Sequence, residues 1–150
     1  MDIKFKKLVP EAQIPYHKYD NDAGFDLTAV SMETTKDYIE YKTGIAVQIP
    51  KGYVGLIFPR SSVTTYDLIL KNCVGVIDAD YLGEIRCRYY NTTNLRNVIT
   101  LETIPAGKIY SVGDRVAQIL FLELPKITLV EAKELSDTLR GEGGFGHTGK

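Results

Sequence analysis

The chain has 150 residues and a formal net charge of −1, with 25% charged and 44% hydrophobic residues. We expect one domain, because a chain of this length buries roughly two thirds of the surface that it exposes when unfolded. Acidic and basic residues are interspersed, so the composition excludes the extended positive field that holds a nucleic acid, and any anion-binding site must be local.

The N-terminal segment, MDIKFKKLVPE, alternates charged residues with single apolar ones such as Ile3 and Phe5. This alternation indicates a half-buried strand and differs from the continuous apolar core of a secretion signal. No stretch of the chain approaches the ~18 apolar residues of a membrane span. We therefore expect a cytoplasmic protein that binds neither membranes nor nucleic acids.

The same alternation recurs at residues 45–49 and 84–89, which are predicted as strands with one buried face. Residues 115–122 are nearly continuously apolar, which is typical of a strand covered on both faces. Only residues 61–68 and 131–140 offer a weak case for helix. Most glycines and the six prolines fall between the apolar runs. The pattern predicts an all-β barrel or sandwich of many short strands.

The two cysteines, Cys73 and Cys87, both fall in strand-like runs. We predict that they are small buried thiols, because a reducing cytosol disfavours a disulfide. A zinc site is not expected, since His17 and His147 are the only histidines that could join them.

Residues 58–65, FPRSSVTT, follow an apolar strand-like run and set Arg60 beside Ser61 and Ser62. A guanidinium is a rigid fork of hydrogen-bond donors, and with adjacent hydroxyls it is well suited to phosphate. Ordinary turns have the same composition, so both interpretations stay open at this point.

Residues 72–85, NCVGVIDADYLGEI, contain Asp78 and Tyr81 between Gly75 and Gly83, and the pattern predicts a β-hairpin. Such a hairpin can admit a flat ligand edge-on, form hydrogen bonds with its edge and keep a carboxylate close to it. Single carboxylates in turns are commonly turn formers, but several polar groups in an otherwise apolar segment favour a binding role.

The C-terminal segment, RGEGGFGHTGK, contains five glycines. Its G-x-G-x-x-G spelling does not indicate a dinucleotide site, because the chain ends before a helix could follow. Arg140 supplies a cation, Phe145 a flat ring, and glycine lets backbone N–H groups approach an anion closely. The segment is predicted either to close over a ligand with a base and phosphates or to be a disordered end.

Five segments occur in the order of the five motifs of the trimeric deoxyuridine triphosphatase (dUTPase) family, which the chain resembles over almost its whole length. The resemblance implies a jelly-roll-like, distorted all-β barrel at residues 1–139 and a flexible arm at residues 140–150. It also implies a homotrimer with sites at the subunit interfaces, and Mg²⁺-assisted hydrolysis of dUTP to dUMP and pyrophosphate. The segments are AGFDLTA (23–29), PRSS (59–62), GVIDADYLGE (75–84), GDRVAQ (113–118) and RGEGGFGHTG (140–149).

By this resemblance, Asp78 is the general base for the water that attacks the α-phosphate. Tyr81 lies under the deoxyribose and excludes a 2′-hydroxyl by crowding. Asn72 and the backbone of the following strand form hydrogen bonds with the uracil edge. With cytosine, a site built for uracil leaves a buried polar group unpaired, and the free-energy penalty is about 1–3 kcal/mol per group. The residues of this set are Asn72, Gly75, Val76, Ile77, Asp78 and Tyr81.

The resemblance also implies the phosphate and metal groups. In the family, Mg²⁺ is bound chiefly by triphosphate oxygens and water, so Asp26 is expected to act through water and Arg115 to be structural. The expected phosphate-binding residues are Arg60, Ser61, Ser62 and Gln118.

In the C-terminal arm, the resemblance implies that Arg140 meets the phosphates and Phe145 stacks on uracil, while Gly146 and His147 contact the phosphates. His147 stands where the family usually has serine, so a hydroxyl donor is replaced by an imidazole that serves only when protonated.

Two other functions stay open. A related branch with the same fold deaminates dCTP, but Arg88 stands where that branch has its catalytic glutamate, which disfavours deamination. Some family members also bind other proteins, so a nucleotide-gated regulatory module is the second alternative.

Overall fold

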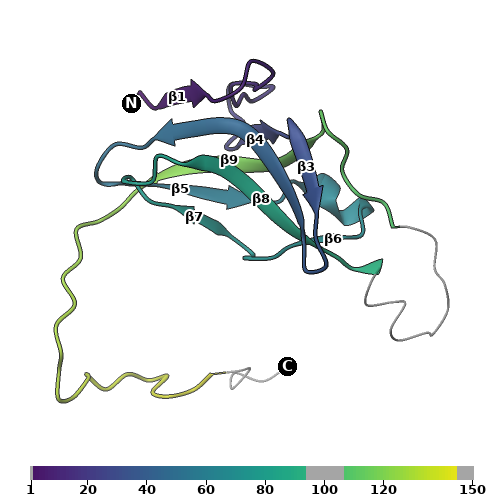
Figure 1. Cartoon of the computed structure of the whole chain (residues 1–150). Helices are drawn as coiled ribbons and strands as arrows, with labels where there is room; N and C mark the ends of the chain where they lie inside the picture. Colours follow the sequence, from purple (N-terminus) through teal and green to yellow (C-terminus); the bar gives the residue numbers. More distant parts are fainter. Residues whose placement is uncertain (1, 94–106, 145–150) are drawn as a thin grey trace.

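The computed structural model describes residues 2–93 and 107–144. Within these residues the fold is all-β, with nine strands, one 3₁₀ helix and two antiparallel sheets (Figure 1). Sheet A has the order β1-β4-β8-β6 with β3 on β4, and sheet B has the order β2-β9-β5-β7. The elements are β1 (Lys4–Lys7), β2 (Phe25–Thr28), β3 (Ser31–Thr34), β4 (Ile39–Gln48), β5 (Tyr53–Phe58), η1 (Ser61–Thr65), β6 (Leu68–Leu70), β7 (Gly75–Ile77), β8 (Glu84–Asn91) and β9 (Arg115–Glu123).

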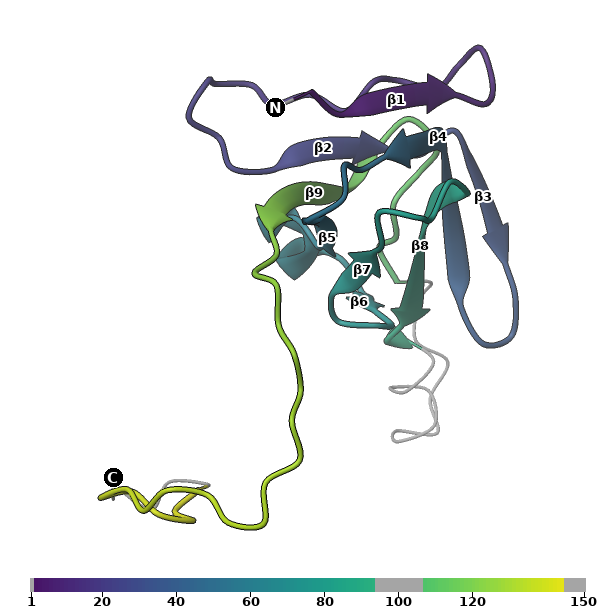
Figure 2. The same ribbon diagram turned by 90° about the vertical axis from the view of Figure 1, so that its left-hand side faces the viewer.

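The two sheets form two layers (Figure 2) with one apolar core between them. Strand β8 shows why the alternation is diagnostic: Ile85, Cys87 and Tyr89 are buried, whereas Arg86 and Arg88 are exposed. The predicted strands at residues 3–5, 45–49, 84–89 and 115–122 are confirmed. The first half of β9 is covered on both faces, but Leu122 is exposed. The predicted all-β, jelly-roll-like class is correct.

Three buried tyrosines pack edge to face at the centre of the core, with ring centroids 5.8–6.0 Å apart. The Tyr41 hydroxyl donates to the carbonyl of Tyr110 at 3.0 Å, and the Tyr89 hydroxyl donates to the carbonyl of Val116 at 2.6 Å. Since Tyr89 lies in sheet A and Val116 in sheet B, this buried hydrogen bond joins the layers.

The predicted hairpin at residues 72–85 is wrong in its pairing. Strand β7 pairs with β5 in sheet B, whereas β8 pairs with β4 and β6 in sheet A. The residues between them therefore connect the two layers. Alternation predicts that a segment is a strand, but it does not specify the partner strand.

Two local expectations also change. Residues 61–65 form a 3₁₀ helix, and residues 131–140 are not helical, because Leu135 and Leu139 have no described surface to pack against and are fully exposed.

Cys87 is buried in β8 as predicted, but Cys73 is exposed in a turn with φ 57°, and both are free thiols. No helix among the described residues is long and apolar enough to cross a membrane.

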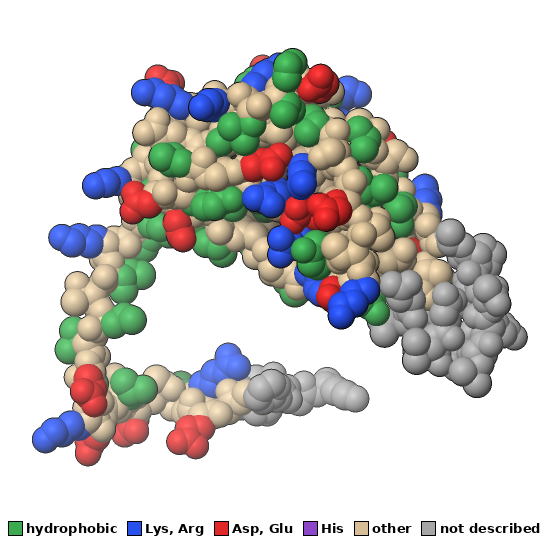
Figure 3. Space-filling view, viewed as in Figure 1, with side chains coloured by type: hydrophobic (Ala, Val, Ile, Leu, Met, Phe, Trp, Pro, Cys, Tyr) green, Lys and Arg blue, Asp and Glu red, His purple; other side chains and the backbone are tan. Residues whose placement is uncertain are grey.

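After β9 the chain leaves the body of the molecule (Figures 1 and 2), and the N–H of Leu124 donates to the carbonyl of Gly52 at the point of departure. The described part of this segment carries hydrophobic side chains away from the two sheets (Figure 3). Its exposed apolar residues are Ile127, Leu129, Val130, Leu135 and Leu139.

Candidate functional site

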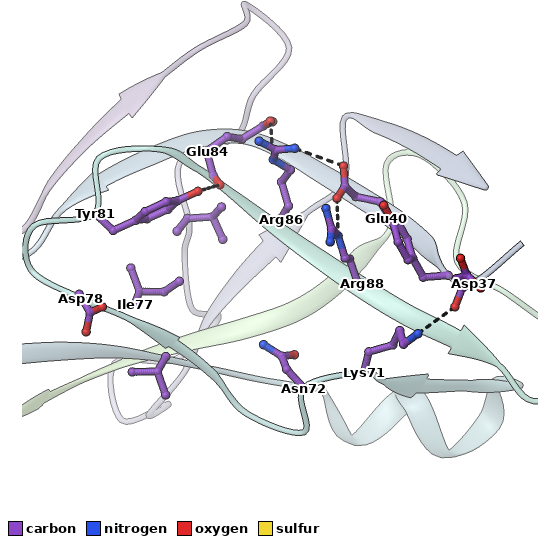
Figure 4. A pocket seen from close by; sticks show the side chains of 13 residues that line it. Asp37, Glu40, Lys71, Asn72, Ile77, Asp78, Tyr81, Glu84, Arg86 and Arg88 are labelled. Atoms are coloured by element: carbon purple, nitrogen blue, oxygen red, sulfur yellow. Dashed lines mark hydrogen bonds and ion pairs between the residues drawn. The ribbon is translucent and has the colours of Figure 1, made fainter. Parts of the chain in front are cut away.

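A first cavity, with a volume of about 750 Å³, lies beside the connection from β7 to β8. Five of the residues that the sequence predicts for base and sugar line it: Asn72, Val76, Ile77, Asp78 and Tyr81. Gly75, the sixth, lies in β7 opposite Ile57. In Figure 4, Asp78 and Tyr81 lie at one end of this cavity and Asp37 and Lys71 at the other.

Asp78 and Tyr81 are held together by the turn after β7. The N–H of Tyr81 donates to the carbonyl of Asp78 at 3.1 Å, and the Tyr81 hydroxyl donates to the carbonyl of Glu84 at 2.9 Å. The Asp78 carboxylate and the Tyr81 ring thus come from one short turn and lie at the same end of the cavity (Figure 4).

The other half of the cavity contains a charged cluster that sequence reasoning missed. The carboxylate of Glu40, only 4% exposed, accepts hydrogen bonds from Arg88 Nε at 2.7 Å and Arg86 Nη1 at 3.4 Å. Burial by itself would raise the pKa of Glu40, but the hydrogen bonds and charges of Arg88 and Arg86 outweigh it, so the pKa is lowered. The Arg88 guanidinium also lies 4.4 Å from the centre of the Tyr38 ring. The Arg88 guanidinium therefore already forms an ion pair with Glu40.

The second cavity, of about 460 Å³, contains most of the predicted phosphate and metal groups. The carboxylate of Asp26 accepts a hydrogen bond from Arg60 Nε at 2.6 Å on one oxygen and from Arg115 Nη1 at 2.9 Å on the other. These contacts orient both guanidiniums and tie β2 to β9 and to the segment after β5. Ser61 and Gln118 line the same cavity, together with His17, Lys18, Tyr19, Asp22, Ala23 and Gly24.

The remaining predicted residues fall elsewhere. Ser62 Oγ accepts a hydrogen bond from Arg60 Nη1 at 3.4 Å, although Ser62 does not line the second cavity. Arg140 lies in the C-terminal segment, where its Nε donates to the carbonyl of Gly143 at 2.9 Å. Phe145, Gly146 and His147 lie outside the described residues.

Asp78 and Arg60 lie near opposite ends of β5. In the register of β5 with β7, Gly55 is opposite Ile77, so Asp78 lies near the start of β5, whereas Arg60 follows its end in extended conformation. With about 3.3 Å per residue in a strand, Asp78 and Arg60 lie on the order of 15–20 Å apart. Within one chain, the residue predicted as general base is therefore far from the arginine predicted to bind phosphate.

No group of three or more His, Cys, Asp or Glu side chains that could cage a metal occurs within residues 2–93 and 107–144. Each oxygen of Asp26 receives one arginine N–H, which leaves a second lone-pair direction for a water molecule. This donor set fits a Mg²⁺ ion that keeps its waters and takes its direct ligands from a triphosphate.

Two antiparallel sheets, one cavity lined by a carboxylate, a phenol and an amide, and a second lined by guanidinium, hydroxyl and amide groups are features of an all-β nucleotide-binding protein. A family model described as dUTPase matches residues 10–149. The chain belongs to the dUTPase family.

Two relatives are similar over all or nearly all of their length. A deoxyuridine 5'-triphosphate nucleotidohydrolase of Nautilia profundicola is 38% identical, with all of both chains covered. One from Paramecium bursaria Chlorella virus 1 is 36% identical, over 96% of this chain and 95% of that protein.

Solved structures are similar in fold. The Staphylococcus bacteriophage 80alpha dUTPase with dUPNHPP has a TM-score of 0.84 at 28% identity, and 99% of each chain is covered. A variant of the dUTPase from phage phi11 of S. aureus, described with a structural Mg(II) ion, has a TM-score of 0.71 at 26% identity, over 89% of this chain and 98% of that one.

Proposed function

We propose that this protein is a dUTP diphosphatase, which hydrolyses dUTP to dUMP and pyrophosphate by attack of water on the α-phosphate. Membership of the dUTPase family across residues 10–149 supports this function. The observation that carries it is the first cavity, where Asp78 and Tyr81 are linked by a hydrogen bond beside Asn72.

In the proposed reaction, Asp78 acts as the general base. Its carboxylate accepts a proton from water as the new bond to phosphorus forms, and the bond to the pyrophosphate oxygen breaks. Asn72 and the backbone of β7, from Gly75 to Ile77, form hydrogen bonds with the uracil edge. The Tyr81 ring lies against the deoxyribose and fills the space of a 2′-hydroxyl.

Arg60, Ser61, Ser62 and Gln118 bind the triphosphate in this proposal. The ion pair between Asp26 and Arg60 supports it, because an oriented guanidinium loses little freedom when phosphate binds. When bound, Mg²⁺ supplies charge neutralisation on the triphosphate oxygens, with Asp26 holding one of its waters. The arm at residues 140–150 closes the site, with Arg140 and His147 on the phosphates, Gly146 as a close backbone donor and Phe145 on the base.

The site is completed between copies of the chain. Because Asp78 and Arg60 lie on the order of 15–20 Å apart in one chain, they cannot act on the same α-phosphate within it. We infer a homotrimer in which the first cavity of one copy faces the second cavity of another. The described strands of each copy end with β9 at Glu123, so the domain boundary predicted at residue 139 falls within the segment that leaves the body.

Product analysis with dUTP, dCTP, UTP and dTTP tests the function. We expect dUMP and pyrophosphate from dUTP and little turnover of the other three, and a deaminated product from dCTP would overturn the proposal. Asp78→Asn is expected to lower kcat at least ~10³-fold, the upper range for loss of a general base, while dUTP still binds. If this variant no longer binds dUTP, Asp78 is not the general base.

A further inference from the structure

The side chain of Tyr81 is fixed from two directions by the residues that follow it. Its hydroxyl donates to the carbonyl of Glu84 at 2.9 Å. Its ring lies against Gly83, where an added Cβ would come within 2.5–2.9 Å of the tyrosine hydroxyl and ring atoms. The orientation of Tyr81 therefore depends on the position of the Glu84 carbonyl (Figure 4).

Glu84 is the first residue of β8, and it lies beside an irregularity in the pairing with β4. Lys42 is opposite Arg86 and Ala46 is opposite Glu84, so β4 advances four residues while β8 advances two. Such a bulge leaves backbone groups of the longer strand without ladder partners. Gly44 lies at the centre of the bulge with φ +65°, a conformation that other residues adopt at a cost.

Side chains bind the backbone groups that the bulge leaves unpaired. The Thr43 hydroxyl donates to the carbonyl of Ile85 at 2.7 Å, and the N–H of Gly44 donates to Glu84 Oε1 at 2.9 Å. The carbonyl of Gly44 accepts a hydrogen bond from the N–H of Leu8 at 2.7 Å. One oxygen of Glu84 is thus the acceptor that anchors the start of β8 to β4.

The other oxygen of Glu84 lies 3.5 Å from Arg86 Nε, and Arg86 in turn contacts Glu40 (Figure 4). Arg86 is half-exposed, so solvent weakens this ion pair. The contact with the N–H of Gly44 is the stronger constraint, because it is shorter, at 2.9 Å, and its donor belongs to the backbone.

We propose that Glu84 is a positioning residue for sugar selectivity: by accepting the N–H of Gly44, its carboxylate fixes the carbonyl that holds Tyr81 against the deoxyribose. The proposal rests on the proposed function, because it assigns selectivity to the Tyr81 ring. A ring held before binding rejects a 2′-hydroxyl, whereas a ring that can move aside admits it.

Three substitutions at Glu84 distinguish the effect of the position of its acceptor oxygen from the effect of its negative charge. Glu84→Ala removes the acceptor, and we expect the ratio of kcat/KM for dUTP to that for UTP to fall about tenfold, as for one lost hydrogen bond. Glu84→Asp keeps the charge but is one methylene too short, so it should resemble Glu84→Ala. Glu84→Gln keeps an oxygen of the right reach and should restore the ratio of the natural protein.

A matched control comes from Glu33 on neighbouring β3, whose exposed carboxylate lies 3.6 Å from Lys42. Glu33→Ala removes a carboxylate from the same sheet without touching the bulge and should leave the ratio unchanged. If Glu84→Asp keeps full selectivity while Glu84→Gln loses it, charge and not anchoring is the cause, and the proposal is wrong.

A double-mutant cycle with Tyr81 tests whether Glu84 affects selectivity through the Tyr81 hydroxyl. Tyr81→Phe removes only the hydroxyl that contacts Glu84, and we expect it to lower the dUTP to UTP ratio by a similar factor. Adding Glu84→Ala to that variant should cause no further loss of selectivity, because the hydrogen bond from the Tyr81 hydroxyl to the Glu84 carbonyl is already absent. Independent, multiplying losses would overturn the inference.

Failure of the inference is distinguishable from failure of the proposed function. A natural protein that does not hydrolyse dUTP rejects the function, whereas one that prefers dUTP but whose Glu84→Ala variant keeps the preference rejects the role of Glu84 alone. Thermal unfolding of each variant establishes that it is folded. If Glu84→Ala fails to fold, the comparison of Glu84→Asp, Glu84→Gln and Tyr81→Phe decides the same question.

Discussion

At the residue scale, the hydroxyls of Tyr41 and Tyr89 are buried in the core, and each donates a hydrogen bond to a backbone carbonyl. Burial raises the pKa of Tyr41 to about 12, more than its hydrogen bond to the carbonyl of Tyr110 lowers it, and burial also raises the pKa of Tyr89. A buried phenolate would lose both its hydration and its role as a donor, so the folded state keeps these protons.

This protonation predicts alkaline sensitivity. An unfolded tyrosine titrates at a pKa of about 10, so between pH ~10 and ~12 the unfolded chain releases protons that Tyr41 and Tyr89 retain in the folded chain. The free energy of unfolding should fall as pH rises through this window. Urea unfolding at a series of pH values measures it, with Tyr41→Phe as the control that should show a shallower fall. A slope that is the same in both proteins would contradict the prediction.

Sequence motifs predicted residues that the structure brings together. Asp78 and Tyr81 stand in the motif at residues 75–84, Asn72 lies just before it, and all three line the first cavity. Their roles stay predictions. Glu40 was missed because its partner Arg88 is far away in sequence and becomes its neighbour only in the register of β4 with β8. The signal in the sequence that could have predicted this ion pair was the charged residues at alternate positions of β4 and β8.

At the level of elements, the short connection between β7 and β8 has the largest consequence for the site. It passes from sheet B to sheet A, so its turn lies where the two layers meet. Alternation predicted both strands correctly. Their partners could not be predicted, because a strand with one apolar face can pair with any neighbour of suitable register.

The C-terminal segment is the element that contributes least to the described core. The described hydrogen bonds of Arg140 and Gly141 are made to Gly143 and Thr138, within the segment itself. Nothing described in the body depends on these residues. Sequence reasoning assigned residues 140–150 a role with the ligand on other grounds: the cation of Arg140, the ring of Phe145, the close approach that glycine allows, and the family resemblance.

Deletion of residues 140–150 should therefore separate folding from turnover. We expect the truncated protein to keep its circular dichroism spectrum and thermal midpoint, and to lose at least ~10²-fold in kcat/KM for dUTP, because the closing contacts and their exclusion of water are gone. Activity and thermal unfolding of the full-length and truncated proteins measure the two effects. Undiminished activity in the truncated protein would show that the arm does not close the site.

At the level of the whole molecule, the separation of Asp78 from Arg60 along β5 bears on what one copy can do. If the two residues act on the same triphosphate, as we propose, they must come from different copies. Length, composition and periodicity predicted one all-β domain, but no pattern in the chain gives the relation between copies.

Shared sites predict complementation between two inactive proteins. Asp78→Asn and Arg60→Ala should each lack activity when assembled alone. Mixed assemblies, prepared by co-expression, should regain about a quarter of the natural activity, because in random symmetric assembly one interface in four joins an intact Asp78 to an intact Arg60. Mixing the same variants without exchange of copies is the control. Mixed assemblies with no activity would show that each site is built within one chain.

The two thiols differ in burial, and this difference allows one of them to be labelled selectively. Cys87 is enclosed in the core, and burial raises the pKa of its thiol to about 12, so it forms almost no thiolate at neutral pH. Cys73 is exposed and follows Asn72, which lines the first cavity. A maleimide dye would consequently attach at one position of the natural sequence, at the rim of the cavity, where its emission can report the arrival and departure of a nucleotide in real time.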